Sequence, residues 1–94
     1  MMAKLTGQQA KQLQEAILSA FDRDELELLL LPLDQSLDRM APPSAALGTV
    51  VLDVIKAAER EGWTAELLRA IATALPNRKD LQALVAKLLT AMGA

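Results

Sequence analysis

The chain has 94 residues, enough for one small domain, and a net charge of −2 from ten Lys and Arg against twelve Asp and Glu. Hydrophobic residues make up 52% of it, mostly Leu and Ala, yet Phe21 and Trp63 are the only aromatic residues. Because Cys and His are absent, disulfides, cysteine nucleophiles, Ser-His-Asp triads and His/Cys zinc sites are excluded. Leu and Ala favour helices, so we expect an all-α chain.

The first half of the sequence carries the signals of three helices, the third of them short. A capping box, in which the N-cap and N3 side chains satisfy each other's backbone donors, fits Thr6 with Gln9 and Asp22 with Glu25. Pro32 disfavours helical geometry in the residue before it and ends the second helix. We therefore expect helices over residues 6–20, 23–31 and 34–40, with Leu33, Leu37 and Met40 turned inward, followed by a proline loop at 41–44.

The second half carries the signals of three more helices. An apolar stripe runs from Leu47 to Ala58 and is followed by a stop signal at Gly62. Thr64 and Asn77 are candidate N-caps for the next two helices. We expect helices from 45 or 47 to 61, over 64–75 and over 77–93. Together the six form one bundle, a single domain over 1–94 with frayed ends at 1–5 and 93–94.

The charged residues are distributed as on solvated helix faces. Carboxylates gather at the start of the second helix, where they favour the positive end of the helix dipole. No Gly-rich phosphate loop and no oxygen-ligand metal loop is present, so we expect no catalytic residue, no metal and no cofactor. With no basic block and no apolar run of about 20 residues, we expect no binding to nucleic acid or membrane and a cytoplasmic location.

Two other functional classes stay open. Ser36 lies in Asp34-Gln35-Ser36-Leu37, which matches two of the three residues of the Asp-Ser-Leu sequence around the modified serine of acyl carrier proteins. A small acidic carrier is therefore the alternative function. A DNA-binding helical domain is a third class, which predicts salt-dependent binding to duplex DNA.

Three apolar residues each have two interpretations. Trp63 is either a boundary residue packed between the fourth and fifth helices or an interface anchor. Leu28 and Leu31 point away from the side of the second helix that carries Leu26 and Leu29. They are either covered by the third helix or form an exposed apolar strip of the kind that marks a partner surface.

An ordered series of fragments resembles a known family. In chain order the fragments are Gly7-Gln8-Gln9, the run from Gln12 to Phe21, the run from Arg23 to Glu27, Leu33-Asp34, Val50-Val51, Ala58-Glu59-Arg60-Glu61-Gly62, Glu66-Leu67-Leu68 and Leu75-Pro76-Asn77. Over about residues 7–84 the chain is similar to the first class of effector-associated domain of bacterial conflict and signalling systems. It departs from the family pattern at Leu29–Pro32, where leucines and a proline replace aromatic and basic residues.

The resemblance implies a death-like six-helix bundle that acts as a non-catalytic adaptor. Such domains are thought to pair like with like and to bring effectors, such as caspase-like or trypsin-like peptidases, TIR domains and NTPases, to their sensors. The expected partners are matching effector-associated domains, in trans or in a homo-oligomer, held by complementary helix faces. The candidate contact residues are Arg23, Asp24, Glu27, Leu28, Leu31, Asp38, Arg39, Arg60, Trp63, Arg69, Arg78 and Lys79.

Overall fold

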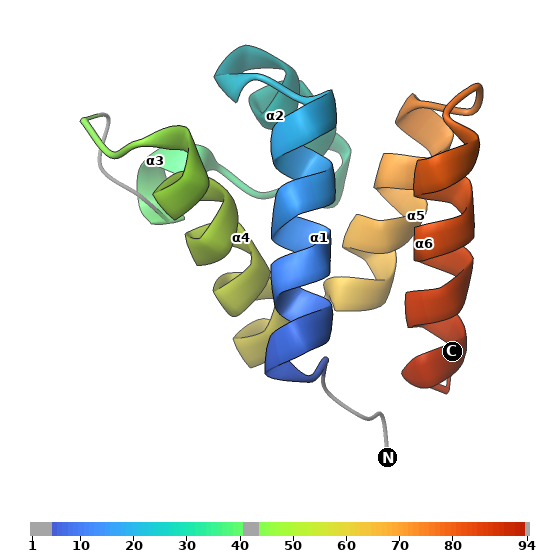
Figure 1. Cartoon of the computed structure of the whole chain (residues 1–94). Helices are drawn as coiled ribbons and strands as arrows, with labels where there is room; N and C mark the ends of the chain where they lie inside the picture. Colours follow the sequence, from blue (N-terminus) through green and yellow to red (C-terminus); the bar gives the residue numbers. More distant parts are fainter. Residues whose placement is uncertain (1–4, 41–43, 94) are drawn as a thin grey trace.

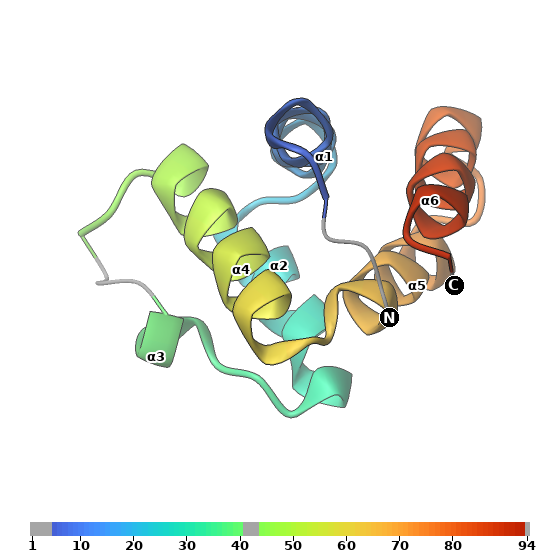
Figure 2. The same cartoon turned by 90° about the horizontal axis from the view of Figure 1, so that it is seen from below.

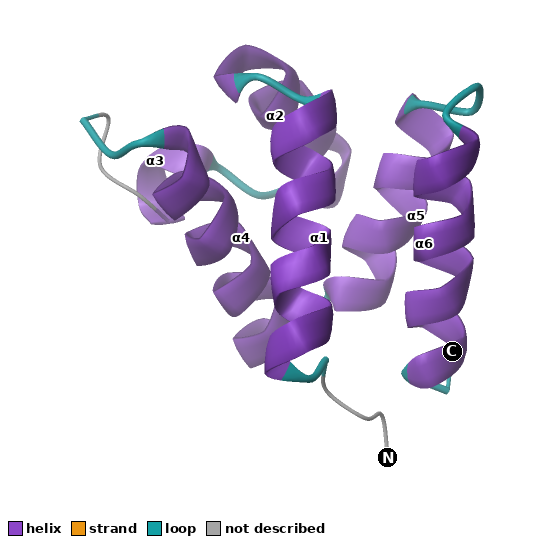
Figure 3. Ribbon diagram, viewed as in Figure 1, coloured by secondary structure: helices purple, strands orange, loops and turns teal. Residues whose placement is uncertain are grey.

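The computed structural model describes residues 5–40 and 44–93, without the side chains of Asp38 and Met40. All regular structure in these residues is helical (Figure 3). The elements are α1 (Gly7–Ala20), α2 (Arg23–Leu30), a 3-10 turn η1 (Leu31–Leu33), α3 (Leu37–Met40), α4 (Leu47–Glu61), α5 (Thr64–Ala74) and α6 (Lys79–Ala91). The predicted all-α class is therefore confirmed.

Helices α1 and α2 begin at the two predicted capping boxes. Thr6 Oγ1 accepts the N–H of Gln9 at 3.1 Å, while Gln9 Oε1 accepts the N–H of Thr6 at 2.9 Å. Asp22 Oδ1 accepts from the N–H of Glu25 at 2.8 Å, and Glu25 Oε1 accepts from the N–H of Asp22 at 3.1 Å. Both starts are set by residues three apart, which is why the sequence alone predicts them.

The predicted short helix over 34–40 is wrong in its first half. Around Pro32 the chain forms η1, closed by the hydrogen bond from Asp34 N–H to Leu31 O at 3.0 Å. Asp34 then adopts a left-handed backbone with φ 60°, which no helix continues through. Only the single turn α3 remains, so the expected count of six helices is not matched: in the described ranges five helices have two turns or more.

The inward side chains expected around this turn are placed as follows. Leu37 is fully buried and Leu33 is half-buried against the core. The side chain of Met40 and the loop residues 41–43 lie outside the described part of the chain. Residues 1–4 and 94, which are most of the ends predicted to fray, also lie outside the described part of the chain. Leu5, which was also predicted to fray, donates its N–H to Glu59 Oε1 at 2.9 Å.

Gly62 ends α4 as predicted, but the predicted caps of the last two helices are wrong. Gly62 has φ 84°, and the N–H groups of Gly62 and Trp63 both donate to Ala58 O, at 2.8 and 3.0 Å. Thr64 is the first residue of α5 rather than its cap. Asn77 lies two residues before α6. The N–H of Arg78 donates to Leu75 O, and the turn that this hydrogen bond closes delays the start of the helix.

The helices pack around one core (Figures 1 and 2). Helix α1 packs on α4, and α5 and α6 form an antiparallel pair beside them, while α2 packs on α5 and α3 on α4. Gln14 Nε2 donates to Gly48 O at 2.9 Å and ties α1 to the start of α4. Every α-helix contributes to the fully buried side chains, which include Leu13, Ile17, Leu26, Leu30, Leu37, Val50, Ile55, Leu67, Leu68, Ile71, Leu81 and Leu88.

Candidate protein-interaction groove

Two large apolar side chains of the second helix region face solvent. Helix α2 buries Leu26, Leu29 and Leu30, so helical spacing turns Leu28 and Leu31 outward, and each is 65% exposed. The third helix does not cover them because the turn after Pro32 leads the chain away and α3 packs on α4. Of the two interpretations open for these leucines, the exposed strip is the one that the structure supports.

An apolar groove of about 650 Å³ lies beside Leu28, between α2 with η1 on one side and α5 on the other. Both sides contribute residues at the spacing i, i+3, i+4, i+7 and i+8, so one face of each helix lines it. The first side contributes Glu25, Leu28, Leu29, Pro32 and Leu33. The second side contributes Glu66, Arg69, Ala70, Thr73 and Ala74, and Phe21 and Leu75 complete the lining.

The two sides of this groove differ in the side chains that line them. Leu28 is 65% exposed on α2, and its neighbour Leu29 is buried. On the α5 side, Ala70, Thr73 and Ala74 have short side chains, while Glu66 and Arg69 on the same face are longer and charged. Thr73 Oγ1 turns back to donate to Arg69 O at 2.9 Å, so its hydroxyl is satisfied within its own helix. The groove therefore has a protruding leucine on one side and a shallow apolar shelf on the other.

Charged side chains of both signs stand at the edge of the groove. Glu25 is partly committed, because its Oε1 accepts from the N–H of Asp22. Glu66 and Arg69 are exposed one turn apart on α5. Among the described residues, ion pairs form between Arg60 and Glu61 and between Arg78 and Asp80, so Glu66 and Arg69 are not engaged in an ion pair within this part of the chain.

The other predicted contact residues do not gather at one place. Only Leu28 and Arg69 of that set line the groove. Asp24 and Glu27 are exposed on α2 and Arg23 is half-buried there, while Arg39 is exposed on α3. The side chain of Asp38 lies outside the described residues. These charges are spread over α2 and α3.

Arg60 and Trp63 lie near the junction of α4 and α5. Arg60 is well exposed and its Nη2 lies 3.5 Å from Glu61 Oε2. Trp63 is half-buried against the core cluster, and its Nε1 donates to Glu61 Oε1 at 3.4 Å. This placement is the boundary position between two helices, which favours the structural interpretation of Trp63.

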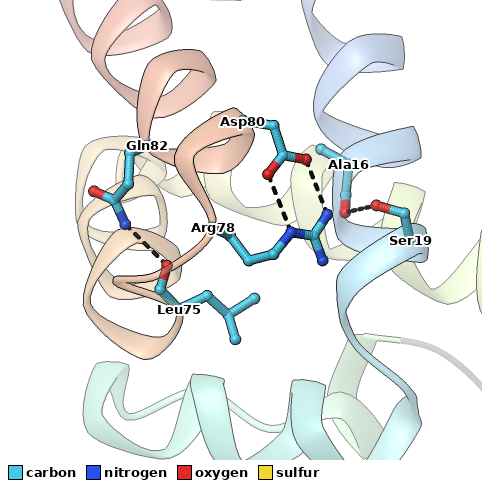
Figure 4. Close-up of polar contacts among 6 residues, drawn as sticks. All are labelled: Ala16, Ser19, Leu75, Arg78, Asp80 and Gln82. Carbon is cyan, nitrogen blue, oxygen red and sulfur yellow. Dashed lines mark hydrogen bonds and ion pairs between the residues drawn. The ribbon is translucent and has the colours of Figure 1, made fainter.

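Arg78 and Lys79 lie at the start of α6. Arg78 makes a two-pronged contact with Asp80, from Nε to Oδ1 at 3.0 Å and from Nη2 to Oδ2 at 2.9 Å (Figure 4). The hydrogen bonds from Arg78 hold the pKa of Asp80 below its ordinary value, and the same contact raises the pKa of Arg78. Lys79 is exposed. Arg78 is therefore occupied within its own chain.

A second hollow, also of about 650 Å³, lies between the start of α1 and the end of α4 and includes Lys11, Lys56 and Arg60. It borders Leu5, where the described part of the chain begins. Elsewhere, Ser36 is exposed just before α3. In the described ranges no group of three His, Cys, Asp or Glu is placed to hold a metal ion, and none of the helices there has the length and apolarity to cross a bilayer.

Most residues of the groove were not among the sequence candidates. Glu66, Ala70, Thr73 and Ala74 share one face of α5, and that face is visible in the sequence as a helical repeat. Nothing local shows that this face lies against α2, which is some 40 residues earlier in the chain. Pairing the two faces requires the tertiary packing.

A known protein family matches the sequence. A family model described as effector-associated domain 1 matches residues 3–89, nearly the whole chain. No curated protein and no solved structure matches it.

Proposed function

Because the chain belongs to the effector-associated domain 1 family, we propose that it is a non-catalytic adaptor that pairs with matching domains, its own copies included. By pairing, it recruits an effector such as a caspase-like or trypsin-like peptidase, a TIR domain or an NTPase in a bacterial conflict signalling system, in the cytoplasm. We also propose that its helices have the death-like arrangement that the resemblance implies.

The observation that carries this proposal is the exposed leucine beside an apolar groove. Burying a leucine side chain stabilises a protein by about 1.5–3 kcal/mol, and most large apolar side chains in the described part of the chain are buried or half-buried, with Leu18 exposed at 37%. Leu28 nevertheless stays 65% exposed on α2, where it lines a groove whose lining is mostly apolar. Apolar surface gathered in this way is typical of a face that a partner covers.

The composition supports a binding role over a catalytic one. With no Cys or His in the sequence, the common nucleophiles and proton-transfer groups are reduced to carboxylates, lysines and hydroxyls. The groove holds two carboxylates, Glu25 and Glu66, both at its edge. One of them, Glu25, has its Oε1 engaged in a helix cap. The adaptor role needs surface complementarity alone.

Capture of one purified copy by another tests the proposal. A tagged chain immobilised on a resin is expected to retain an untagged copy of the same chain, and to retain other effector-associated domains of the same class. An unrelated all-helical domain of similar size and net charge is the control and should pass through. If the immobilised chain retains neither its own copies nor any matching domain, the adaptor proposal is wrong.

A further inference from the structure

We propose that the groove between α2 and α5 is the pairing surface itself, and that two copies of the chain dock on it face to face about a two-fold axis. In this arrangement Leu28 of each copy packs on the shelf formed by Ala70, Thr73 and Ala74 of the other. The inference rests on the proposed homotypic pairing and adds to it the surface and the symmetry.

The shape of the patch suits a second copy of the same chain. A two-fold interface uses one surface patch twice, so the patch must hold both a protrusion and the recess that receives it. Leu28 is 65% exposed and forms the protrusion. Ala70, Thr73 and Ala74 form the recess, because their short side chains let an opposing helix approach closely. Protrusion and recess therefore lie next to each other on one patch.

The charges at the edge of the groove are also self-complementary. Arg69 stands on the same patch as Glu25 and Glu66, and neither Arg69 nor Glu66 is held in an ion pair within the described residues. Facing copies can place each Arg69 toward the carboxylates of the other copy. If a partner surface carried charges of one sign only, some charged residues at this edge would face a like charge, which opposes association.

The second exposed leucine supplies a matched control. Leu31 is as exposed as Leu28 and lies three residues away, but it does not line the groove. Self-association of the wild type, Leu28→Ala and Leu31→Ala is measured by light scattering over a range of concentrations. We expect Leu28→Ala to weaken association by about tenfold or more, as for a central interface residue, and Leu31→Ala to change it by less than about twofold.

Charge exchange tests the two-fold arrangement. Arg69→Glu makes the edge of the groove wholly acidic, so this variant alone should not self-associate, and Glu66→Arg alone should associate more weakly than the wild type. Mixed in equal amounts, the two variants should associate with each other and form mixed dimers. Arg60→Glu, which changes an exposed arginine outside this groove, is the control and should associate as the wild type does. Circular dichroism checks that every variant keeps its helices.

The outcomes separate this inference from the proposed function. If the wild type associates and Leu28→Ala and Leu31→Ala behave alike, or the mixed charge variants stay apart, the groove is not the pairing surface, although pairing itself stands. If Arg60→Glu abolishes association while Arg69→Glu does not, the surface lies at the junction of α4 and α5. If the wild type does not associate at all, pairing between copies and the role of the groove are both wrong.

Discussion

At the scale of single residues, Thr64 is buried in a position that does not use its hydroxyl. The residue is 2% exposed, and its Oγ1 has no hydrogen-bond partner in the described part of the chain. An unsatisfied buried hydroxyl costs about 1–3 kcal/mol. Thr64→Val replaces it with a methyl group of similar size, so we expect the free energy of unfolding to rise by about 1 kcal/mol in urea titrations.

The exposed Thr49 on α4 provides the control for this substitution. Thr49→Val removes a hydroxyl that water solvates, so it should change stability by less than about 0.5 kcal/mol. A clear loss of stability in Thr64→Val would mean that the hydroxyl has a partner after all, such as a buried water molecule.

The contact between Arg78 and Asp80 gives a pH dependence whose sign is fixed. Because hydrogen bonds from Arg78 lower the pKa of Asp80 in the folded state, this carboxylate stabilises the fold above its ordinary pKa of about 3.9. The contribution is lost as the pH falls through the lowered value. The difference in unfolding free energy between the wild type and Asp80→Asn should therefore be small but positive at neutral pH. It should shrink in titrations repeated at about pH 3.

Residue roles were predictable where both partners are near in sequence. The capping boxes at Thr6 and Asp22 each involve two residues three positions apart, and both form as predicted. Thr64 has the right residue type for a cap, but packing buries it one residue inside the helix. The sequence alone could not decide whether Leu28 and Leu31 are exposed, because their exposure depends on where the third helix packs.

At the scale of helices, two glycines in open space should respond oppositely to the same substitution. Gly62 ends α4 with φ 84°, whereas Gly7 opens α1 without a positive φ, and an added Cβ meets nothing within 4 Å at either position. Gly62→Ala should therefore lose about 1 kcal/mol from backbone strain alone.

Gly7→Ala serves as the matched partner of that change. Alanine is the better helix former, so thermal and urea unfolding should show Gly7→Ala to be neutral or stabilising by up to about 1 kcal/mol. Equal effects at the two positions would contradict the left-handed end of α4.

The elements themselves were mostly predictable, since α1, α2, α4, α5 and α6 each show an apolar stripe of helical period. The short third helix was not. Pro32 and the left-handed Asp34 divide the segment from Leu31 to Met40 into η1 and a separate turn, so only Leu37–Met40 of the expected span 34–40 is helical. That division is a property of the local backbone that apolar spacing does not report, and it is what leaves Leu31 and Leu28 uncovered.

At the scale of the whole molecule, the groove is a product of packing between segments distant in the chain. The faces of α2 and α5 that line it are each ordinary helix faces in the sequence, and only their contact makes a hollow with a leucine beside it. The sequence indicated the family, and it predicted two residues of the groove, Leu28 and Arg69, as contact residues. The short side chains of α5 that line the groove could be identified only once the packing of α5 against α2 was known.

The proposed two-fold docking also fixes the size of the assembly. A surface that pairs with itself is used up in a dimer, whereas an interface between two different surfaces can continue into a ring or filament. Association is therefore expected to stop at two copies. Recruitment of an effector would then join one domain on the sensor to one on the effector.

Sedimentation equilibrium of the wild-type chain at increasing concentration tests whether two copies pair and whether association stops at the dimer. We expect the apparent mass to rise from 10.1 kDa to twice that value and then to stay constant. A mass that remains 10.1 kDa up to about 1 mM would contradict pairing between copies, and a mass that keeps rising beyond the dimer would contradict the closed two-fold arrangement.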